Sequence, residues 1–294
     1  MFKGLWNRYF KNYKVAMVIP LVILVLSFSI IYFNYSRTGD FVPMDVSIKG
    51  GTTITVQTDI SYGADELVSW FESEFNVADV NVRDLKALVG ETVLGYEFQT
   101  TSFLDSAVIK EKFALKFGIG EKTEKLSIGL QGPVLGEKFI ESTIKILFIA
   151  FVLMGITVFW YFKSIAPSIS IMFSTFADVV GMLAILSILG MPLNIAGIGA
   201  MLMMIGYSTD SDVLLASNII KYKEGELEQR MKNVLKTEVT MSVAAFVCYA
   251  LMFFISNVDT IRNIALILML GLIFDLTNTW LLGAALQRIY AEKK

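Results

Sequence analysis

The hydrophobic pattern of this 294-residue chain consists of long apolar runs and one polar block. Each run approaches or exceeds the roughly 20 residues that a helix needs to cross a bilayer. We therefore predict six transmembrane helices, the last five of them within residues 138–290. The predicted spans cover residues 15–35, 140–162, 165–189, 193–220, 234–255 and 261–286.

Residues 1–14 have a different pattern, in which aromatic and apolar side chains recur at helical spacing. This face consists of Phe2, Leu5, Trp6, Tyr9, Phe10 and Tyr13, and the basic residues lie off it. Such a segment is typical of an amphipathic helix that lies in the membrane interface. Residues 291–294 form a short polar tail.

The polar block, residues 36–137, alternates strand and helix patterns. Strands are predicted over 47–58, 77–85, 91–101 and 124–131, and helices over 61–75 and 104–117. The order βαββαβ is typical of an α+β, ferredoxin-like domain built from split β-α-β units. The block contains no motif for catalysis, metal binding or nucleotide binding.

The distribution of Lys and Arg predicts the orientation of the chain. Basic residues gather in the first 14 residues, at Lys163, in the loop after the fourth span and at the carboxyl end. With six spans, all of these positions fall on one side, which the positive-inside rule identifies as the cytoplasm. The polar block then lies outside, and both termini lie inside, in a multi-pass protein of the plasma membrane.

Composition narrows the classes of function. The chain is 55% hydrophobic, and its net charge of -2 gives no basic surface for nucleic acid. It has no histidine, which excludes His-based catalysis and His-ligated metals. The single Cys248 excludes a disulfide within the chain. We expect a protein that is not an enzyme and holds no cofactor or metal.

The most informative polar residues are acids within the predicted spans. Asp178 and Asp275 lie near the middle of spans three and six, and Asp210 and Asp212 lie in the inner half of span four. A carboxylate at the centre of a bilayer costs about 2.5–3.5 kcal/mol on insertion scales. Because no Lys or Arg lies deep in a span, these acids must be protonated, bound to a cation or hydrogen-bonded.

Span six adds polar neighbours, since Asp275, Asn278 and Thr279 share a helical face. We expect this face to form a polar cluster with Asp178 or Asp210. We further expect Asn278 or Thr279 to bridge Asp178 and Asp210. The candidates for ion coupling are therefore Asp178, Asp210, Asp212, Asp275 and Asn278.

The alternative is that these acids only join helices by hydrogen bonds. This structural reading suits Asp212 and Glu238 best, since Glu238 lies near the amino end of its predicted span, where the helix dipole favours an acid. Four small residues, Gly197, Gly199, Ala200 and Gly206, are expected to be close-packing positions. An intramembrane aspartyl protease is disfavoured, because Asp210 lacks the Gly-x-Gly-Asp context.

Four short motifs link the chain to a known family. They are Lys49-Gly50-Gly51-Thr52, Gly132-Pro133-Val134-Leu135-Gly136, Asp178-Val179-Val180 and Ile205-Gly206-Tyr207-Ser208. They are similar to the F-x-G-G-T, G-P-x-V-G, H-D-V and I-I-G-Y-S elements of one family, in the same order. With the six-span layout, the chain resembles the SecF branch of the SecD/SecF protein-export family, within the RND superfamily.

One departure from the bacterial pattern affects the mechanism. Bacterial members have an Arg in span five, where this chain has Met241. The run from Asp275 to Trp280 is similar to the archaeal branch, which also lacks that Arg. The bacterial Asp–Arg pair therefore cannot be transferred to this chain.

The resemblance implies an accessory subunit of the Sec translocase. It would act with a SecD-like six-span subunit, the Sec channel, translocating protein chains and membrane lipid, and it would use an ion gradient. Two other functions stay open. One is a half-size RND transporter, which should have an apolar pocket at the junction of the polar domain and the membrane. The other is an uncoupled scaffold of the Sec channel.

Overall fold

The computed structural model describes residues 6, 9–58, 60, 62–77, 79–86, 93–118, 125–131, 133–222, 225–256 and 258–292. Contacts divide the chain into two compact units. We call Met1–Pro43 with Ile144–Lys294 the helical bundle, and Met44–Thr143 the sheet domain. Gly132 of the predicted motif, and Lys293 and Lys294 of the predicted tail, lie outside the described residues.

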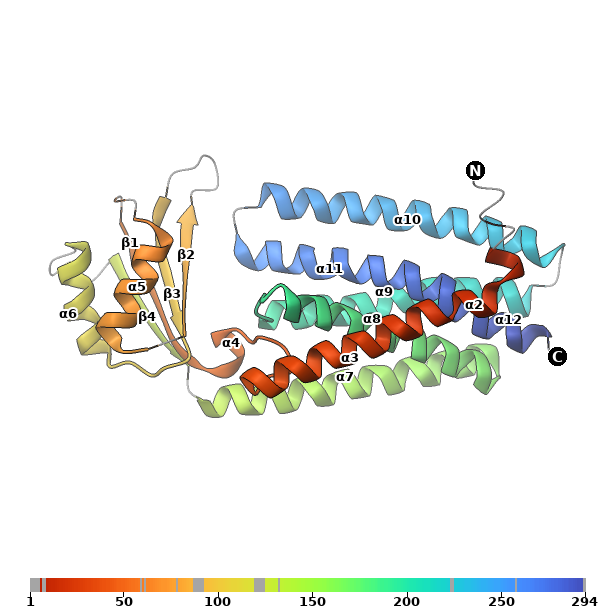
Figure 1. The fold of residues 1–294 in the computed structure, drawn as a ribbon, viewed down its shortest axis with the longest axis horizontal. Coiled ribbons are helices and arrows are strands. Elements are labelled where there is room, and N and C mark those ends of the chain that lie inside the picture. Colours follow the sequence, from red (N-terminus) through yellow and green to blue (C-terminus); the bar gives the residue numbers. More distant parts are fainter. Residues whose placement is uncertain are drawn as a thin grey trace. The chain divides into compact units, whose positions relative to one another are not determined.

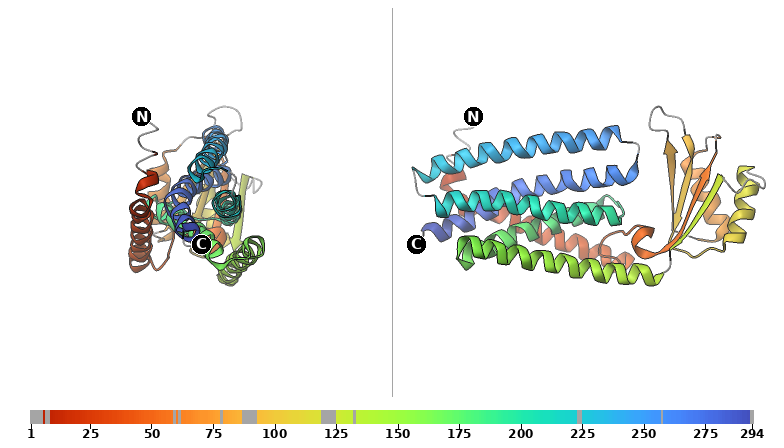
Figure 2. Two further views of the ribbon diagram at one scale, coloured as in Figure 1. Left: turned by 90° about the vertical axis from the view of Figure 1, so that its right-hand side faces the viewer. Right: turned by 180° about the vertical axis from the view of Figure 1, so that it is seen from behind.

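The sheet domain has the predicted succession of two helices and four strands, preceded by a short helix. Its elements are α4 (Val46–Lys49), β1 (Gly51–Gln57), α5 (Ala64–Phe75), β2 (Val80–Lys86), β3 (Val93–Thr100), α6 (Ser106–Phe117) and β4 (Leu126–Gln131). The strands form an antiparallel sheet in the order β2-β3-β1-β4. Both long helices lie on one side of this sheet, as Figures 1 and 2 show.

The predicted first strand begins too early, because residues 46–49 form α4. Gly50 lies between α4 and β1, and Gly51 is the first residue of β1; their φ angles are 83° and 139°. A Cβ at Gly51 would lie 2.1 Å from the carbonyl oxygen of Thr100 in β3. The Gly-Gly motif therefore allows the chain to turn sharply into the sheet.

The core of the sheet domain is aromatic and closed. The inward faces of β1 and β3 meet the stripes of α5 and α6. The buried members are Ile54, Val56, Leu67, Phe71, Tyr96, Phe98, Ile109, Phe113 and Phe117. The Tyr96 hydroxyl accepts from the amide of Tyr62 at 2.7 Å and donates to the Tyr62 carbonyl at 3.2 Å. The buried hydroxyl of Tyr96 therefore keeps its hydrogen bonds and adds no desolvation penalty to this core.

Most helices of the helical bundle are long and run side by side (Figures 1 and 2), and the first residues of α7 belong to the sheet domain. The helices are α2 (Tyr13–Ala16), α3 (Val18–Thr38), α7 (Pro133–Phe162), α8 (Ile165–Ile188), α9 (Ile195–Ala216), α10 (Leu227–Ile255), α11 (Asp259–Asn278) and α12 (Ala284–Glu292). Two π-helical segments, η2 (Ser217–Lys221) and η3 (Thr279–Gly283), follow α9 and α11 directly.

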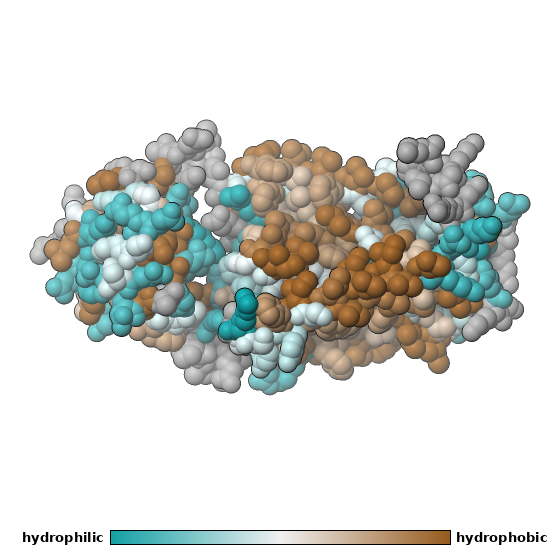
Figure 3. All heavy atoms as spheres, viewed as in Figure 1, coloured by the Kyte–Doolittle hydropathy of each residue, from teal (hydrophilic) through white to brown (hydrophobic). Residues whose placement is uncertain are grey.

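In the described part of the chain, five helices are long and apolar enough to cross a membrane. They cover Tyr13–Arg37, Glu141–Phe162, Ile165–Ile188, Leu227–Ile255 and Thr260–Glu292. The face of the bundle in Figure 3 is accordingly mainly hydrophobic. Helix α9 is not among the five, and it is the helix that carries both Asp210 and Asp212.

The amino-terminal aromatic residues contact protein. Trp6 is 8% exposed and packs in a cluster with Trp280 and Met231. The Tyr9 hydroxyl donates to the carbonyl of Trp280 at 2.5 Å, and the Tyr13 hydroxyl donates to Glu292 at 2.6 Å. The predicted aromatic face thus packs on the bundle in the described residues, and an interfacial position of the segment stays a prediction.

Candidate functional site

Asp178 lies in the middle of α8 and is buried at 2% exposure. Both of its carboxylate oxygens accept a hydrogen bond. Ser208 of α9 donates to Oδ2 at 2.6 Å, and the amide of Asn278 of α11 donates to Oδ1 at 2.7 Å. Asp178 therefore joins three helices.

Asp212 and Asp275 share one hydroxyl. The Oγ1 of Thr279 lies 3.0 Å from Oδ1 of Asp212 in α9 and 3.3 Å from Oδ1 of Asp275 in α11. All three side chains are fully buried. A hydroxyl has one hydrogen to donate, so it can donate to only one of the two carboxylates and could accept from the other if that carboxyl were protonated.

These two acids differ from Asp178 in how many of their carboxylate oxygens have a hydrogen-bond partner. Oδ2 of Asp212 and Oδ2 of Asp275 have no hydrogen-bond partner, although both are buried. The buried side chains of the described residues include no Lys or Arg. No three His, Cys, Asp or Glu side chains in this described set are grouped closely enough to hold a metal ion. The pair is thus an uncompensated buried charge unless a proton or a single cation neutralises it.

Small residues let the three helices approach. A Cβ at Gly283 would lie 3.0 Å from Oδ1 of Asp212 and 3.6 Å from the hydroxyl of Ser174. A Cβ at Gly181 would meet the ring of Phe274 at 2.5 Å, and one at Gly271 would meet Met204 at 2.5 Å. Close packing without Cβ atoms is the usual way in which membrane helices meet.

The α-helix changes to a π-helix at this site. Helix α11 ends at Asn278, and η3 begins at Thr279, so the bridging hydroxyl is the first residue of the π-helical segment. π-Helical turns are rare and occur frequently at functional sites. The segment aims Thr279 at both acids while Asn278 reaches Asp178.

The predicted cluster of Asp178, Asp210 and Asp275 is wrong in one member. The side chain of Asp210 is exposed on α9, whereas Asp212 is buried. Two residues along a helix differ by about 200° in direction, so the two acids point to opposite faces. Neither Asn278 nor Thr279 bridges to Asp210, because they bind Asp178 and the Asp212–Asp275 pair.

The helix-dipole explanation for Glu238 is also wrong. Helix α10 begins at Leu227, well before the predicted start of the span, so Glu238 lies far beyond the first turn. Glu238 is 1% exposed, and its Oε2 accepts from the indole of Trp280 at 2.9 Å. Its Oε1 has no partner. Glu238 is therefore a third buried acid with one unpaired oxygen. Its partner Trp280 follows Thr279 directly in η3.

Two of the four small residues expected at close contacts are not at such contacts within this chain. Gly197 and Ala200 are buried, whereas Gly199 and Gly206 are exposed and have no atom near a built Cβ. Tyr207 follows Gly206 and shares a hydrogen bond of 3.2 Å with Ser242 of α10. Pro133 and Gly136 lie in the first turn of α7, where proline suits the first helical position.

Ser208 and Trp280 were not assigned roles from the sequence. Ser208 precedes Asp212 by four residues and so lies on the same face of α9, which was a usable signal. The partner of Ser208, Asp178, lies on another helix, so only the structure identifies the contact. The pairing of Trp280 with Glu238 has no sequence signal.

Residues 111–293 match the family described as "Protein export membrane protein SecD/SecF, C-terminal". The protein-export membrane protein SecF of Pyrococcus furiosus is 32% identical over 96% of this chain and 92% of its own length. SecF of Methanocaldococcus jannaschii is also 32% identical, over 95% of this chain and 96% of its own length.

A solved structure shares the fold. SecDF from Thermus thermophilus, described as a translocon-associated membrane protein, aligns with 97% of this chain at a TM-score of 0.76 and 15% identity. This chain spans 38% of that longer protein.

The matched residues include α8 to α12 and hence every acid of the cluster. The two archaeal relatives extend the match over nearly the whole length, and the chain is a multi-pass membrane protein. This chain belongs to the SecD/SecF family of protein-export membrane proteins.

Proposed function

We propose that this chain is an accessory subunit of Sec-dependent protein export that uses an ion gradient through the Asp212–Asp275 pair. The observation that carries the proposal is the pair itself, buried between α9 and α11 with one unpaired oxygen on each acid. Family membership supports the role in export.

The chemistry of the pair supports ion coupling. One proton on either acid would let that carboxyl donate to Oγ1 of Thr279 while Thr279 donates to the other acid. Loss of the proton would leave two buried negative charges sharing one donor, which is costly in a low-dielectric site. Occupied and empty states therefore favour different helix positions, and the difference can drive motion.

Asp178 supports this site in a different way. Because both of its oxygens are bonded, it suits a fixed joint between α8, α9 and α11. The scaffold alternative describes Asp178 well, but it leaves the unpaired oxygens of Asp212 and Asp275 without a purpose.

The transporter alternative has less support. The apolar pocket described for the bundle lies where α3 and α8 begin, whereas the sheet domain follows the other end of α3. It is therefore not the pocket that a half-size transporter would need at the junction with the polar domain.

The finer architecture belongs to the same proposal. We take α9 as a sixth span, because its neighbours α8 and α11 are long enough to cross and it contacts both of them. The strand order and the βαββαβ succession support a ferredoxin-like domain outside the membrane. A cysteine at Asp65 should then react with an impermeant thiol reagent from outside, and one at Glu226 should not.

An exposed stripe on α9 supports a SecD-like six-span partner. Gly199, Met203, Gly206 and Asp210 are all exposed and recur at three- or four-residue spacing. A carboxylate that faced lipid would be costly, while glycines allow a second helix to approach closely. The stripe therefore suits a protein neighbour better than lipid.

The deciding experiment compares Asp212→Asn and Asp275→Asn with Asp210→Asn. Each change keeps the shape of the side chain and removes the titratable group. We expect export of a secreted test protein to slow at least about tenfold in the first two variants. This corresponds to an increase of about 1.4 kcal/mol in the activation free energy of export. Asp210→Asn should stay within about twofold once rates are normalised to the copurifying partner. Wild-type export in both buried variants would support the scaffold instead.

A further inference from the structure

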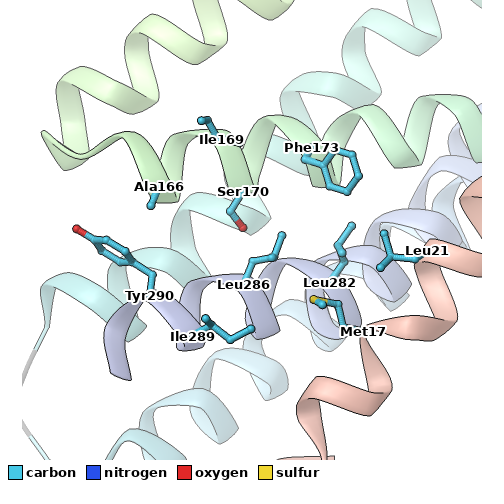
Figure 4. A pocket seen from close by; sticks show the side chains of 10 residues that line it. All are labelled: Met17, Leu21, Ala166, Ile169, Ser170, Phe173, Leu282, Leu286, Ile289 and Tyr290. Atoms are coloured by element: carbon cyan, nitrogen blue, oxygen red, sulfur yellow. The ribbon is translucent and has the colours of Figure 1, made fainter. Parts of the chain in front are cut away.

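A groove on the bundle surface lies between α8 and the last turns of the chain (Figure 4). One wall is formed by Ala166, Ile169 and Phe173 of α8, and the other by Leu282, Leu286 and Ile289. Leu282 is buried, while Ala166 and Ile169 are exposed, so the groove has a closed floor and an open side. Its volume is about 490 Å³.

The lining of the groove favours a hydrocarbon occupant. The lining residues of α8 lie within the eight residues 166–173, or about 10 Å along the helix. Nearly all of the lining side chains are apolar, which suits a hydrocarbon chain. The basic residue at one end of the groove favours an anionic lipid over an apolar partner helix.

One end of the groove is polar. The hydroxyl of Tyr290, which lines the groove, shares a hydrogen bond of 2.8 Å with Ser164. Lys163 precedes Ser164 and is exposed. Lys14 is also exposed and precedes the lining residue Met17 by three residues, close to one helical turn. Positive charge and hydroxyls thus lie together where α8 begins, at Lys163, Ser164 and Tyr290.

We propose that this groove is a binding site for one anionic phospholipid. Its hydrocarbon chain lies between α8 and α12, directed towards Phe173 and Leu21, and its phosphate lies near Lys163, Ser164 and Tyr290. Juxtamembrane lysines attract anionic headgroups, and tyrosine hydroxyls prefer the headgroup level. The proposal does not depend on ion coupling, because none of these residues belongs to the acid cluster.

The test is lipid retention by the purified full-length chain, with and without its copurified partner. The protein is extracted from vesicles that contain equal amounts of phosphatidylglycerol and phosphatidylcholine, and bound lipid is counted by native mass spectrometry. We expect one retained lipid per chain, with at least fivefold preference for phosphatidylglycerol. Ala166→Phe, which fills the groove, should lower retention at least fivefold. The matched control Ala244→Phe, on the exposed face of α10, should not.

The headgroup is tested separately. Lys163→Gln combined with Lys14→Gln should reduce the preference for phosphatidylglycerol to less than twofold, and Lys236→Gln, an exposed lysine of α10, should leave it intact. Equal retention of both lipids by the wild-type protein would overturn the proposal. Equal loss in Ala166→Phe and Ala244→Phe would also overturn it.

A second measurement covers variants that fail to fold. Phosphatidylglycerol with a photoactivatable diazirine on its acyl chain is crosslinked to the wild-type protein, and the labelled peptides are identified. Labels should concentrate on 166–173 and 282–290, relative to the exposed face of α7 around Ile156. Uniform labelling of the bundle surface would mean only bulk lipid. Labelling that disappears when the partner subunit is present would mean that protein covers the groove, and either result contradicts the proposal.

Discussion

The cores of the two units are built on opposite principles. The sheet domain buries Phe71, Phe98 and Phe113 together, and its buried hydroxyls on Tyr96 and Thr52 have backbone partners. The bundle buries carboxylates, and Asp212 and Asp275 each keep an unpaired oxygen. Among the described residues, the buried side-chain polar atoms without a hydrogen-bond partner all lie in the bundle and none in the sheet domain. The two cores thus differ in how completely they pair the polar groups that they bury.

The largest expected effect tests the aromatic core. Phe113→Ala should lower the free energy of unfolding of the isolated sheet domain by about 3–5 kcal/mol, because it leaves a cavity among closely packed rings. Leu115→Ala is the control, since Leu115 lies on the same helix and is 80% exposed. Urea denaturation followed by circular dichroism measures both. A loss below about 1 kcal/mol for Phe113→Ala would contradict a self-sufficient core.

A smaller effect tests the shared hydroxyl of the bundle. Thr279→Val keeps the shape of the side chain but removes the donor between Asp212 and Asp275. Hydrogen bonds to charged groups contribute about 1.5–3 kcal/mol, so we expect export to slow about tenfold. Thr277→Val is the matched control, because that hydroxyl donates only to the carbonyl of Ile273. If the two variants export equally well, Thr279 has no part in coupling.

The smallest effect tests the packing beside the acids. The methyl group of Gly283→Ala would lie 3.0 Å from Oδ1 of Asp212 and should displace it by a few tenths of an ångström. We expect about a threefold loss of export rate and little loss of thermal stability. Gly206→Ala is the control for thermal stability alone and should leave the melting temperature of the isolated chain unchanged, since no atom lies within 4 Å of the added carbon. A neutral Gly283→Ala would show that the position of Asp212 tolerates movement.

Element order was predictable because local patterns in the sheet domain are strong. Helices predicted over 61–75 and 104–117 occur as α5 and α6, with Gly63 and Asp105 at their amino ends. The carboxylate of Asp105 caps α6 by accepting from the amide of Ala107. The short helix α4 was missed, because four residues rich in β-branched side chains carry no helical period.

Prediction in the bundle was less complete. Apolar runs located the helices. The shared face of Asp275, Asn278 and Thr279 predicted a polar cluster with Asp178 or Asp210, and Asn278 bonds Asp178. The same reasoning chose Asp210 over Asp212 and gave Glu238 a place at a helix end. Both errors concern the direction in which a side chain points, which a run of apolar residues does not indicate.

The sequence by itself determined that the chain is a membrane protein with one folded polar block, that it belongs to an export family, and that a few acids within its apolar helices are the candidates for function. Only the tertiary structure decided which acids meet. In a soluble domain, water distinguishes the inner face of a helix from the outer face, as it does for α5 and α6. Around a membrane helix such as α9, lipid is as apolar as the protein interior, so the sequence does not distinguish the inner face from the outer face. Only the packing of the helices buries Asp212 and exposes Asp210.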